Sequence, residues 1–335
     1  GGKWKPSSRI CDFIHEDAIP AMLSLTKLKE RTKKNYRTYL LYVASELDGY
    51  PIVNAVRPRT LEDAFGRIAL NHGTSTARQA IKATSKYVME RLIREELISS
   101  NPLRDFAPDL PDHVALSRPP GGQALTPDQK ERVIYYLLST DVAEIFAKDK
   151  TSRRYSRENQ RAKQRLVVDA TLLQSVTGMR IGEIRSLRRK GVSEIDGVLI
   201  IEISPEDSKT KKGRRIPVLD ERISERLRER LISVDGSPDY FVFSAPAAPD
   251  KEWDASNAQK AVRQLYTKLA DVLDVPLLSK NRSHIWRTTL NNEWMDAGIP
   301  EVIRSAYLGH TEDVNRQYYT DLTDISLMMK MYRNK

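Results

Sequence analysis

A histidine and a tyrosine lie nine residues apart near the end of the 335-residue chain, at His310 and Tyr319. Gly309 precedes the histidine as a turn residue, and mostly polar residues fill the interval. A tyrosine hydroxyl has a pKa of about 10, so it is a weak nucleophile at neutral pH. If Tyr319 attacks an electrophile, cationic groups elsewhere in the chain must stabilise the charge that develops.

Four further positions supply such groups. Arg180 follows a glycine at an expected helix start, and Lys209 begins a basic turn. His284 and Arg287 are three residues apart, so a helix would place both on one face. Each signal is weak alone, because an arginine at a helix start is usually a surface residue and His-x-x-Arg is common by chance.

Taken together, in this order and at this spacing, these residues resemble the catalytic set of the tyrosine recombinases, the phage-integrase family. The resemblance covers nearly the whole chain. The motifs that support it are Thr177-Gly178-Met179-Arg180-Ile181-Gly182-Glu183, Lys209 with Pro217 eight residues on, His284-Ile285-Trp286-Arg287, Leu308-Gly309-His310, and Tyr319.

The resemblance implies that the Tyr319 hydroxyl attacks a DNA phosphodiester, giving a 3′-phosphotyrosine link and a free 5′-hydroxyl. It assigns the charge on the non-bridging phosphate oxygens to Arg180 and Arg287. The residue type suits this task, because a guanidinium is always charged and its planar fork matches phosphate geometry.

The resemblance also implies the proton transfers. Lys209 acts as the general acid that protonates the leaving 5′-oxygen. His284 accepts the tyrosine proton, and His310 donates to a phosphate oxygen. Glu183 lies three residues after Arg180, so it either orients that guanidinium or is an ordinary carboxylate on a helix surface.

Two of these residues have neighbours of the same type. Tyr318 is adjacent to Tyr319, and the family's spacing from the histidine selects Tyr319 as the nucleophile. Lys211 and Lys212 crowd the turn, and the family's spacing to the following proline selects Lys209.

No cofactor is expected. Two arginines take the place that a two-metal clamp has in other phosphoryl-transfer sites, and the sequence has neither an acidic cluster suited to magnesium nor a Walker-type loop for ATP. The single cysteine, Cys11, allows no intrachain disulfide and no Cys-based zinc site. The phosphotyrosine bond conserves the energy of the broken linkage, so religation needs no energy source.

The net charge of +10 favours a polyanionic partner, with nucleic acid first, over an ordinary basic enzyme. No apolar run approaches the roughly 20 residues that span a bilayer, so no membrane contact is expected. No signal peptide is evident. We therefore expect a cytoplasmic protein associated with DNA, in a bacterial or phage-host cell.

The fold class expected is mainly α. Residues 1–105 are predicted to form a helical bundle, with helices starting near Thr32, at Thr60 as an N-cap, and at Thr74 to Thr76. The bundle ends at Asn101-Pro102. By resemblance it is the family's core-binding domain, a SAM-like bundle that binds DNA.

Basic residues on two of these helices are either a DNA-facing surface or solvated faces, and their pairing in one bundle favours DNA. Further basic residues in the linker and in the turn could touch phosphates. The DNA contacts expected are Lys33, Lys34, Arg37, Arg78, Lys82, Lys86, Arg118, Lys211 and Lys212.

Residues 106–123, rich in Pro, Gly and Asp, are predicted to be a linker. The second domain, residues 124–335, begins with Thr126 as N-cap and Pro127 in the first helical turn. By resemblance it is the catalytic domain. A charged stretch, 147–165, is either a solvated helix or a DNA contact. A buried helix is expected at 166–176, strands at 198–203 and 215–218 in a small antiparallel sheet, then helices to the end.

The segment after Tyr319 has an apolar stripe at helical spacing. It either packs on its own domain or, as the resemblance implies, is an exchange helix that docks on a neighbouring subunit. The family then implies a monomer when free, a homotetramer in the synaptic complex on double-stranded DNA with specific core sites, and accessory DNA-bending proteins as further partners. The stripe residues are Leu322, Ile325, Met328, Met329 and Tyr332.

The function expected is that of a site-specific recombinase, an integrase of a phage or mobile element. A type IB topoisomerase-like enzyme shares the tyrosine chemistry, but the first domain and the exchangeable tail disfavour it. A DNA-binding regulator with a vestigial site is the third alternative, and the complete catalytic set argues against it.

Overall fold

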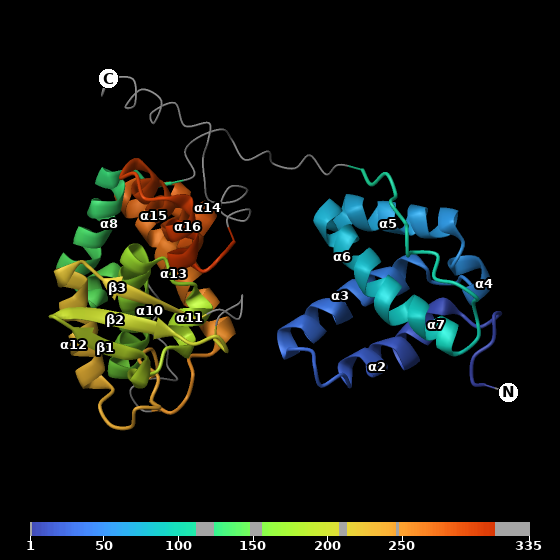
Figure 1. The fold of residues 1–335 in the computed structure, drawn as a ribbon, viewed down its shortest axis with the longest axis horizontal. Helices are drawn as coiled ribbons and strands as arrows, with labels where there is room; N and C mark the ends of the chain where they lie inside the picture. Colours follow the sequence, from blue (N-terminus) through green and yellow to red (C-terminus); the bar gives the residue numbers. More distant parts are fainter. Residues whose placement is uncertain (1, 112–123, 148–155, 208–212, 246–247, 312–335) are drawn as a thin grey trace, which may run out of the picture. The chain divides into compact units, whose positions relative to one another are not determined.

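The computed structural model describes residues 2–111, 124–147, 156–207, 213–245 and 248–311. The chain divides into two compact units, residues 1–118 and 119–335. Each unit has its own hydrophobic core, and each is described by itself (Figure 1).

The first unit is helical throughout its regular structure. Two of its long helical stretches each contain one π-helical turn (η1 and η2). The elements are α1 (Ile10–Phe13), η1 (Ile14–Ala18), α2 (Ile19–Leu23), α3 (Glu30–Glu46), α4 (Ile52–Ala55), α5 (Pro58–His72), α6 (Thr74–Thr84), η2 (Ser85–Met89) and α7 (Glu90–Arg94).

Helix α5 shows why this unit forms a bundle. Its buried residues include Leu61, Phe65 and Ile68, which follow the spacing of one helical face. Helix α6 turns alanines inward, among them Ala77 and Ala80, and these small side chains allow it to lie close to α3 and α5.

Two helix starts differ from the sequence prediction. Helix α5 begins at Pro58 rather than after Thr60, since proline at the first helical position has a backbone angle already suited to a helix. Helix α6 begins at Thr74 itself, with Gly73 before it. The Thr74 hydroxyl donates a hydrogen bond to the carbonyl oxygen of Pro111 over 2.8 Å instead of capping the helix.

That bond belongs to a wider contact between the first unit and the start of the predicted linker. Phe106 and Leu110 pack against the core of this unit. The ring of Phe106 lies 5.9 Å from that of Phe65. The described part of the linker, through residue 111, is therefore attached to the helical unit.

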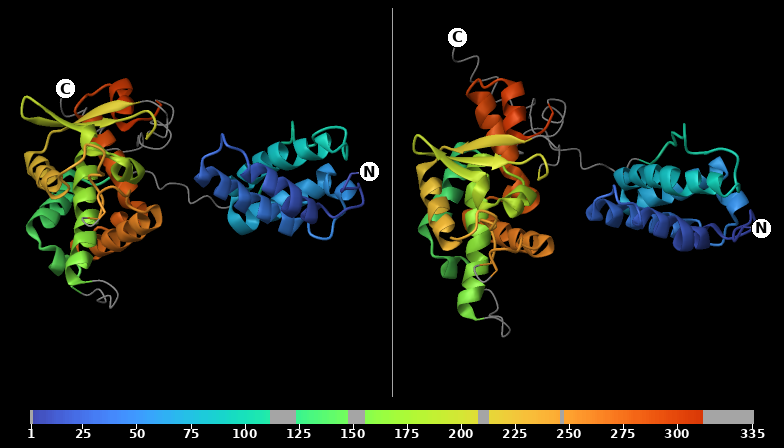
Figure 2. Two further views of the ribbon diagram at one scale, coloured as in Figure 1. Left: turned by 90° about the horizontal axis from the view of Figure 1, so that it is seen from below. Right: turned by 60° about the horizontal axis from the view of Figure 1, so that its bottom comes forward.

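The second unit surrounds one long helix, α10. Its elements are α8 (Pro127–Ser139), α9 (Val142–Ile145), α10 (Arg157–Thr177), α11 (Ile181–Ser186), η3 (Arg189–Gly191), β1 (Val192–Ile195), β2 (Val198–Ile203), β3 (Arg214–Val218), α12 (Glu221–Ser233), α13 (Ala255–Leu273), α14 (Leu277–Asn281), η4 (Arg282–His284), α15 (Ile285–Asp296) and α16 (Glu301–Leu308). Residues 166–175 of α10 are all buried. Figure 2 shows α10 passing through the middle of this unit, with the sheet near its C-terminal end.

The sheet has three antiparallel strands in the order β1-β2-β3. The sequence analysis identified β2 and β3 but missed β1. Asp196 and Gly197 join β1 to β2 with backbone φ angles of 51° and 80°, as a tight Asp-Gly hairpin turn requires. Strand β3 tolerates Pro217 because it is an edge strand of this sheet.

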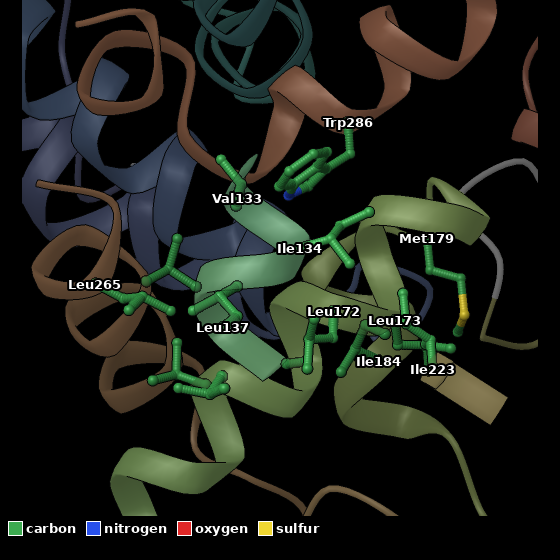
Figure 3. Packing of buried hydrophobic residues seen from close by; sticks show 14 of the residues in the cluster. Val133, Ile134, Leu137, Leu172, Leu173, Met179, Ile184, Ile223, Leu265 and Trp286 are labelled. Atoms are coloured by element: carbon green, nitrogen blue, oxygen red, sulfur yellow. The ribbon is translucent and has the colours of Figure 1, made fainter. Parts of the chain in front are cut away.

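The core of the second unit lies between α8, α10, α13 and α15. Figure 3 shows Val133, Leu172, Leu265 and Trp286 among the side chains that fill it. The indole N–H of the fully buried Trp286 donates to the hydroxyl of Tyr266. The prediction of a mainly helical protein with a small antiparallel sheet is thus confirmed. Within the described residues, no helix is both long enough and apolar enough to span a bilayer.

Candidate active site

The site begins where α10 ends. Gly178 adopts a left-handed conformation, with φ of 63°, and its N–H bonds to the carbonyl oxygen of Gln174. This is the left-handed cap that glycine favours, as the sequence predicts. A Cβ on Gly178 would lie 2.6 Å from Cδ2 of Leu308, so the turn is also packed too tightly for a side chain.

Arg287 joins this turn to a second helix end. Its side chain is buried, although it is a charged group. Its Nη1 donates to the carbonyl oxygen of Gly178 over 2.7 Å, and its Nη2 donates to the carbonyl oxygen of Leu308. The guanidinium therefore fixes the end of α10 against the end of α16.

Arg180 stands directly before α11. Its backbone N–H donates to Oε2 of Glu183 over 2.8 Å, and its Nη1 donates to Oε1 of the same carboxylate over 3.0 Å. Its Nη2 donates to the carbonyl oxygen of Gly309 over 3.1 Å. The Glu183 side chain is only 2% exposed, so it is not a helix-surface carboxylate.

A third arginine, Arg214 at the start of β3, meets the same carboxylate. Its Nη1 and Nη2 donate to Oε1 and Oε2 of Glu183 over 3.0 and 2.8 Å. Its Nε donates to the carbonyl oxygen of Tyr307 over 2.8 Å. The sequence analysis missed Arg214. The only signal is a pair of arginines at a strand start, one of which must face inward because side chains alternate along a strand.

The end of α16 presents His310. The N–H groups of Gly309 and His310 donate to the carbonyls of Ala306 and Ser305, which is a Schellman cap. Gly309 has φ of 65°, and a Cβ there would lie 2.5 Å from Nη1 of Arg214. Glycine is thus required both by its backbone angle and by the guanidinium beneath it.

The electrostatics of this cluster disfavour a charged imidazole. Burial, followed by the positive charges of Arg287, Arg180 and Arg214, lowers the pKa of His310 to about 4. The Thr311 carbonyl, 3.3 Å from Nδ1, opposes this shift. His310 is therefore neutral at pH 7 in the structure as described.

His284 ends the short 3-10 turn η4, directly before α15, and is exposed. A continuous helical face shared with Arg287 was expected. The chain instead changes from a 3-10 turn to an α-helix at Ile285, so His284 precedes the helix that contains the buried Arg287.

The cluster carries a net positive charge and is partly buried. The guanidiniums of Arg180 and Arg214 bind one carboxylate, Glu183, and the charge of Arg287 acts with theirs on His310. Among the described residues, no group of three or more His, Cys, Asp or Glu side chains could hold a metal ion. The arrangement can bind an anion through fixed donors.

Several predicted residues lie outside the described part of the chain. They are Lys209, Lys211 and Lys212 of the basic turn, Arg118 of the linker, Tyr318, Tyr319, and the apolar stripe from Leu322 to Tyr332.

The predicted DNA-contact residues of the first unit lie on two helical stretches that touch. The rings of Tyr36 and Tyr87 are 5.2 Å apart and join α3 to η2. Five of the six basic residues are exposed, whereas Lys33 is half-buried and pairs with Glu30 over 2.9 Å. The exposed ones are Lys34 and Arg37 on α3, and Arg78, Lys82 and Lys86 on α6 and η2.

Comparison with known proteins assigns the chain to one family. The profile of the phage integrase family matches residues 136–325, more than half of the chain. The chain belongs to this family, the tyrosine recombinases, as the motifs predict. No curated protein sequence gave a significant match.

Solved structures of similar fold include three recombinases bound to DNA. The Tn1549 transposon integrase, in complex with a circular intermediate DNA, has 18% identity and a TM-score of 0.68, covering 98% of this chain and 100% of that one. XerH, in a post-cleavage complex with a palindromic difH substrate, has 15% identity and a TM-score of 0.66, covering 98% and 97%. A lambda integrase dimer bound to a COC′ core site has 16% identity and a TM-score of 0.60, covering 96% and 82%.

Proposed function

We propose that this chain is a site-specific DNA recombinase that cuts and rejoins DNA through a 3′-phosphotyrosine intermediate. One observation carries the proposal: Arg180 and Arg214 bind the buried carboxylate of Glu183, and the charges of these two arginines and of Arg287 act together on His310. With His310 neutral, three positive charges against one negative charge leave an excess of two. A phosphodiester supplies the complementary negative charge, and family membership supplies the reaction.

The cleavage step balances as follows. The Tyr319 oxygen bonds to phosphorus, its proton passes to His284, and the bond from phosphorus to the 5′-oxygen breaks. Lys209 gives a proton to that oxygen. Arg180 and Arg287 stabilise the charge on the non-bridging oxygens, and the backbone bonds of Arg287 fix it before DNA arrives. Religation reverses these steps, so no external energy source enters.

In this scheme, the imidazole of His310 becomes protonated when DNA binds. When Nδ1 of the neutral ring donates to the Thr311 carbonyl, Nε2 has no proton to offer. A bound phosphate favours the doubly protonated ring, because a nearby negative charge raises a histidine pKa. His310 then donates to a phosphate oxygen, at the cost of taking up one proton.

Adduct formation tests the proposal directly. A binding site is first selected from a random duplex library, and duplexes nicked at successive positions are then incubated with protein. A nick near the crossover releases a short fragment after cleavage and traps the covalent complex. An SDS-resistant adduct is expected with the wild type and with Tyr318→Phe, but not with Tyr319→Phe.

The alternatives predict other outcomes. A regulator with a vestigial site would bind DNA and give no adduct on any nicked duplex. A type IB topoisomerase would relax plasmid that lacks the selected site. Equal adduct yields from Tyr319→Phe and the wild type would remove Tyr319 from the reaction.

We propose that the first unit binds DNA through its exposed basic residues on α3, α6 and η2. Arg37→Ala and Lys82→Ala should each weaken DNA binding and reduce the salt slope of log Kd by about 1. Arg67 is a matched control, because its side chain pairs with Glu46 over 2.6 Å and is not on the proposed surface. Equal effects of Arg67→Ala and Arg37→Ala would contradict a defined DNA surface.

We further propose that the apolar C-terminal stripe docks on a neighbouring subunit in a tetrameric synapse. A hollow of about 500 Å³ between α8, β3, α15 and α16 offers an apolar acceptor site. Leu219, Ile303 and Tyr307 line it and are 78%, 44% and 38% exposed in this chain. Deleting residues 322–335 should reduce recombination more than DNA binding, and Ile303→Glu should do the same. Equal loss of both activities would favour packing within one subunit.

A further inference from the structure

We propose that Arg214 is a positioning residue for DNA cleavage, which acts by holding Glu183 so that Arg180 stays available to the scissile phosphate. The inference rests on the proposed function, since it assigns a role within that reaction. Arg214 lies 31 residues from Glu183 in sequence, and neither of the motifs that contain Arg180 and His310 includes it.

Arg214 is fixed more completely than Arg180. Its side chain is 7% exposed, against 18% for Arg180. Both of its terminal nitrogens bind Glu183, in the two-pronged geometry that gives the strongest arginine–carboxylate pairs. Its Nε is bound to the Tyr307 carbonyl. Arg214 therefore has its fork turned toward Glu183 and away from an incoming ligand.

Arg180 is held by fewer bonds. Of the five N–H donors in its guanidinium, one binds Glu183 and one binds the Gly309 carbonyl. Within the described part of the chain, the other three donors have no partner and remain for a phosphate. A buried carboxylate needs a cation beside it. If Arg214 were missing, Arg180 would be the remaining arginine at Glu183, and its fork would turn toward the carboxylate.

The titration of Glu183 agrees with this order of importance. Burial is the largest single influence and would raise the pKa of the carboxyl, but the hydrogen bonds and charges of Arg214 and Arg180 together outweigh it, and the pKa is lowered. The backbone N–H and the charge of Arg180 contribute less. Arg214 is thus the larger source of the stabilisation that keeps Glu183 ionised.

Arg214 also links the elements that hold the other reacting groups. It is the first residue of β3, and it binds the carbonyl oxygen of Tyr307 near the end of α16. Its guanidinium also lies against Gly309. Lys209 is five residues earlier in the sequence than Arg214. One guanidinium therefore joins the start of β3 to the first turn of α11 and to the end of α16.

Single-turnover cleavage of the selected nicked duplex, at saturating protein, tests the role. Arg214→Ala should slow adduct formation about 100-fold, since small misplacements of a reacting group have effects of that size. Arg215→Ala is the matched control, because Arg215 is the next residue, has the same charge and is exposed. It should cleave at close to the wild-type rate.

A mutant cycle separates positioning from a merely structural role. If Arg214 acts through Arg180, the double variant Arg180→Ala/Arg214→Ala should cleave no more slowly than Arg180→Ala. Slowly accumulating adduct can be followed over hours because the nicked substrate traps it. Thermal unfolding identifies any variant that fails to fold, and Arg214→Lys then replaces Arg214→Ala in the same cycle, with a smaller expected loss because the charge is kept.

Two results would overturn the inference while leaving the proposed function intact. One is that the wild type forms the adduct and Arg214→Ala forms it as fast as Arg215→Ala does. The other is a loss from Arg214→Ala that multiplies with that from Arg180→Ala, because the two residues would then act independently. A wild-type protein that gives no adduct would instead remove the proposed function itself.

Discussion

Arg287 donates a hydrogen bond from Nη1 to the carbonyl oxygen of Gly178 over 2.7 Å, across 109 residues of sequence. The bond fixes the helix that contains Arg287 against the turn that leads to Arg180. Buried guanidinium donors need partners, and here backbone carbonyls supply two of them. Carbonyls do not cancel the charge as a carboxylate would. The groups that we propose bind the phosphate are therefore in place before a ligand arrives, which is the condition for electrostatic catalysis.

Gly178→Ala should damage this junction. The left-handed backbone costs an alanine about 1–2 kcal/mol, and the added Cβ would lie 2.6 Å from Cδ2 of the buried Leu308. Overpacking adds about 1–3 kcal/mol. Gly298→Ala is a matched control, because Gly298 has φ of 77° with nothing within 4 Å of its Cβ position. Thermal unfolding should show a larger loss for Gly178→Ala, and equal losses would mean that packing at the junction is unimportant.

The low pKa of His310 predicts a pH-dependent stability. The folded value is about 4, and the ordinary value is 6.5. Between these values the unfolded chain binds more protons, so stability from the neutral ring is complete above pH 6.5 and is lost as the pH falls toward 4. The difference in melting temperature between the wild type and His310→Gln should change over this window. A difference that is constant with pH would contradict the buried, neutral ring.

DNA binding should have the opposite dependence on pH. Because a phosphate favours the charged ring, binding takes up a proton, and affinity rises as the pH falls from 7 to 5. Titration calorimetry in buffers of different ionisation enthalpy measures the proton uptake. His310→Gln should take up fewer protons than the wild type. Equal uptake would place the titrating group elsewhere.

Features that depend on adjacent residues are predictable from the sequence. Thr126 caps α8, as the Thr126-Pro127 pair predicts, and Gln129 completes a capping box. Gly178 ends α10 for the reason that glycine is favoured there. Both features depend on a few adjacent residues, so one sequence contains all the information that they need.

Contacts between distant residues, and a strand without an alternating apolar pattern, are not predictable in this way. The ion pair of Arg214 with Glu183 spans 31 residues, and no periodicity in one sequence indicates such a contact. Strand β1 was missed because three of its four residues are exposed, so it has no alternating apolar pattern. Its only clear sign is the Asp196-Gly197 turn that follows it.

Asp169→Asn should strongly destabilise the second unit. Asp169, 6% exposed, accepts from Nε of Arg226 over 2.8 Å and from Nε of Arg230 over 2.7 Å. Removing one partner of a buried ion pair costs about 3–5 kcal/mol, because the remaining charge is left unpaired. Thermal unfolding should show this loss.

The control for Asp169 is an exposed pair. Glu131 binds Arg222, with side chains 55% and 46% exposed, and exposed pairs contribute at most about 1 kcal/mol. Glu131→Gln should therefore leave the melting temperature almost unchanged. If Asp169→Asn were equally mild, a water or a rearranged arginine would be compensating the buried charge.

The last prediction concerns the general acid. If Lys209 protonates the leaving 5′-oxygen, Lys209→Ala should slow cleavage of an ordinary duplex much more than cleavage of one with sulfur at the 5′-bridging position. A thiolate leaves without a proton, since thiols have pKa values of about 8.5 and alcohols are far weaker acids. Lys211→Ala and Lys212→Ala, which make the same change in the same turn, should show no such difference between the two substrates.

The ratio of the two cleavage rates isolates proton transfer from DNA binding. Loss of a phosphate contact slows cleavage of both substrates equally and leaves the ratio unchanged. Loss of the acid slows mainly the ordinary duplex and therefore changes the ratio. A changed ratio in Lys211→Ala or Lys212→Ala would reassign the acid within the turn. An unchanged ratio in all three variants would mean that the leaving oxygen takes its proton from outside the turn, and Lys209 would then be a phosphate contact only.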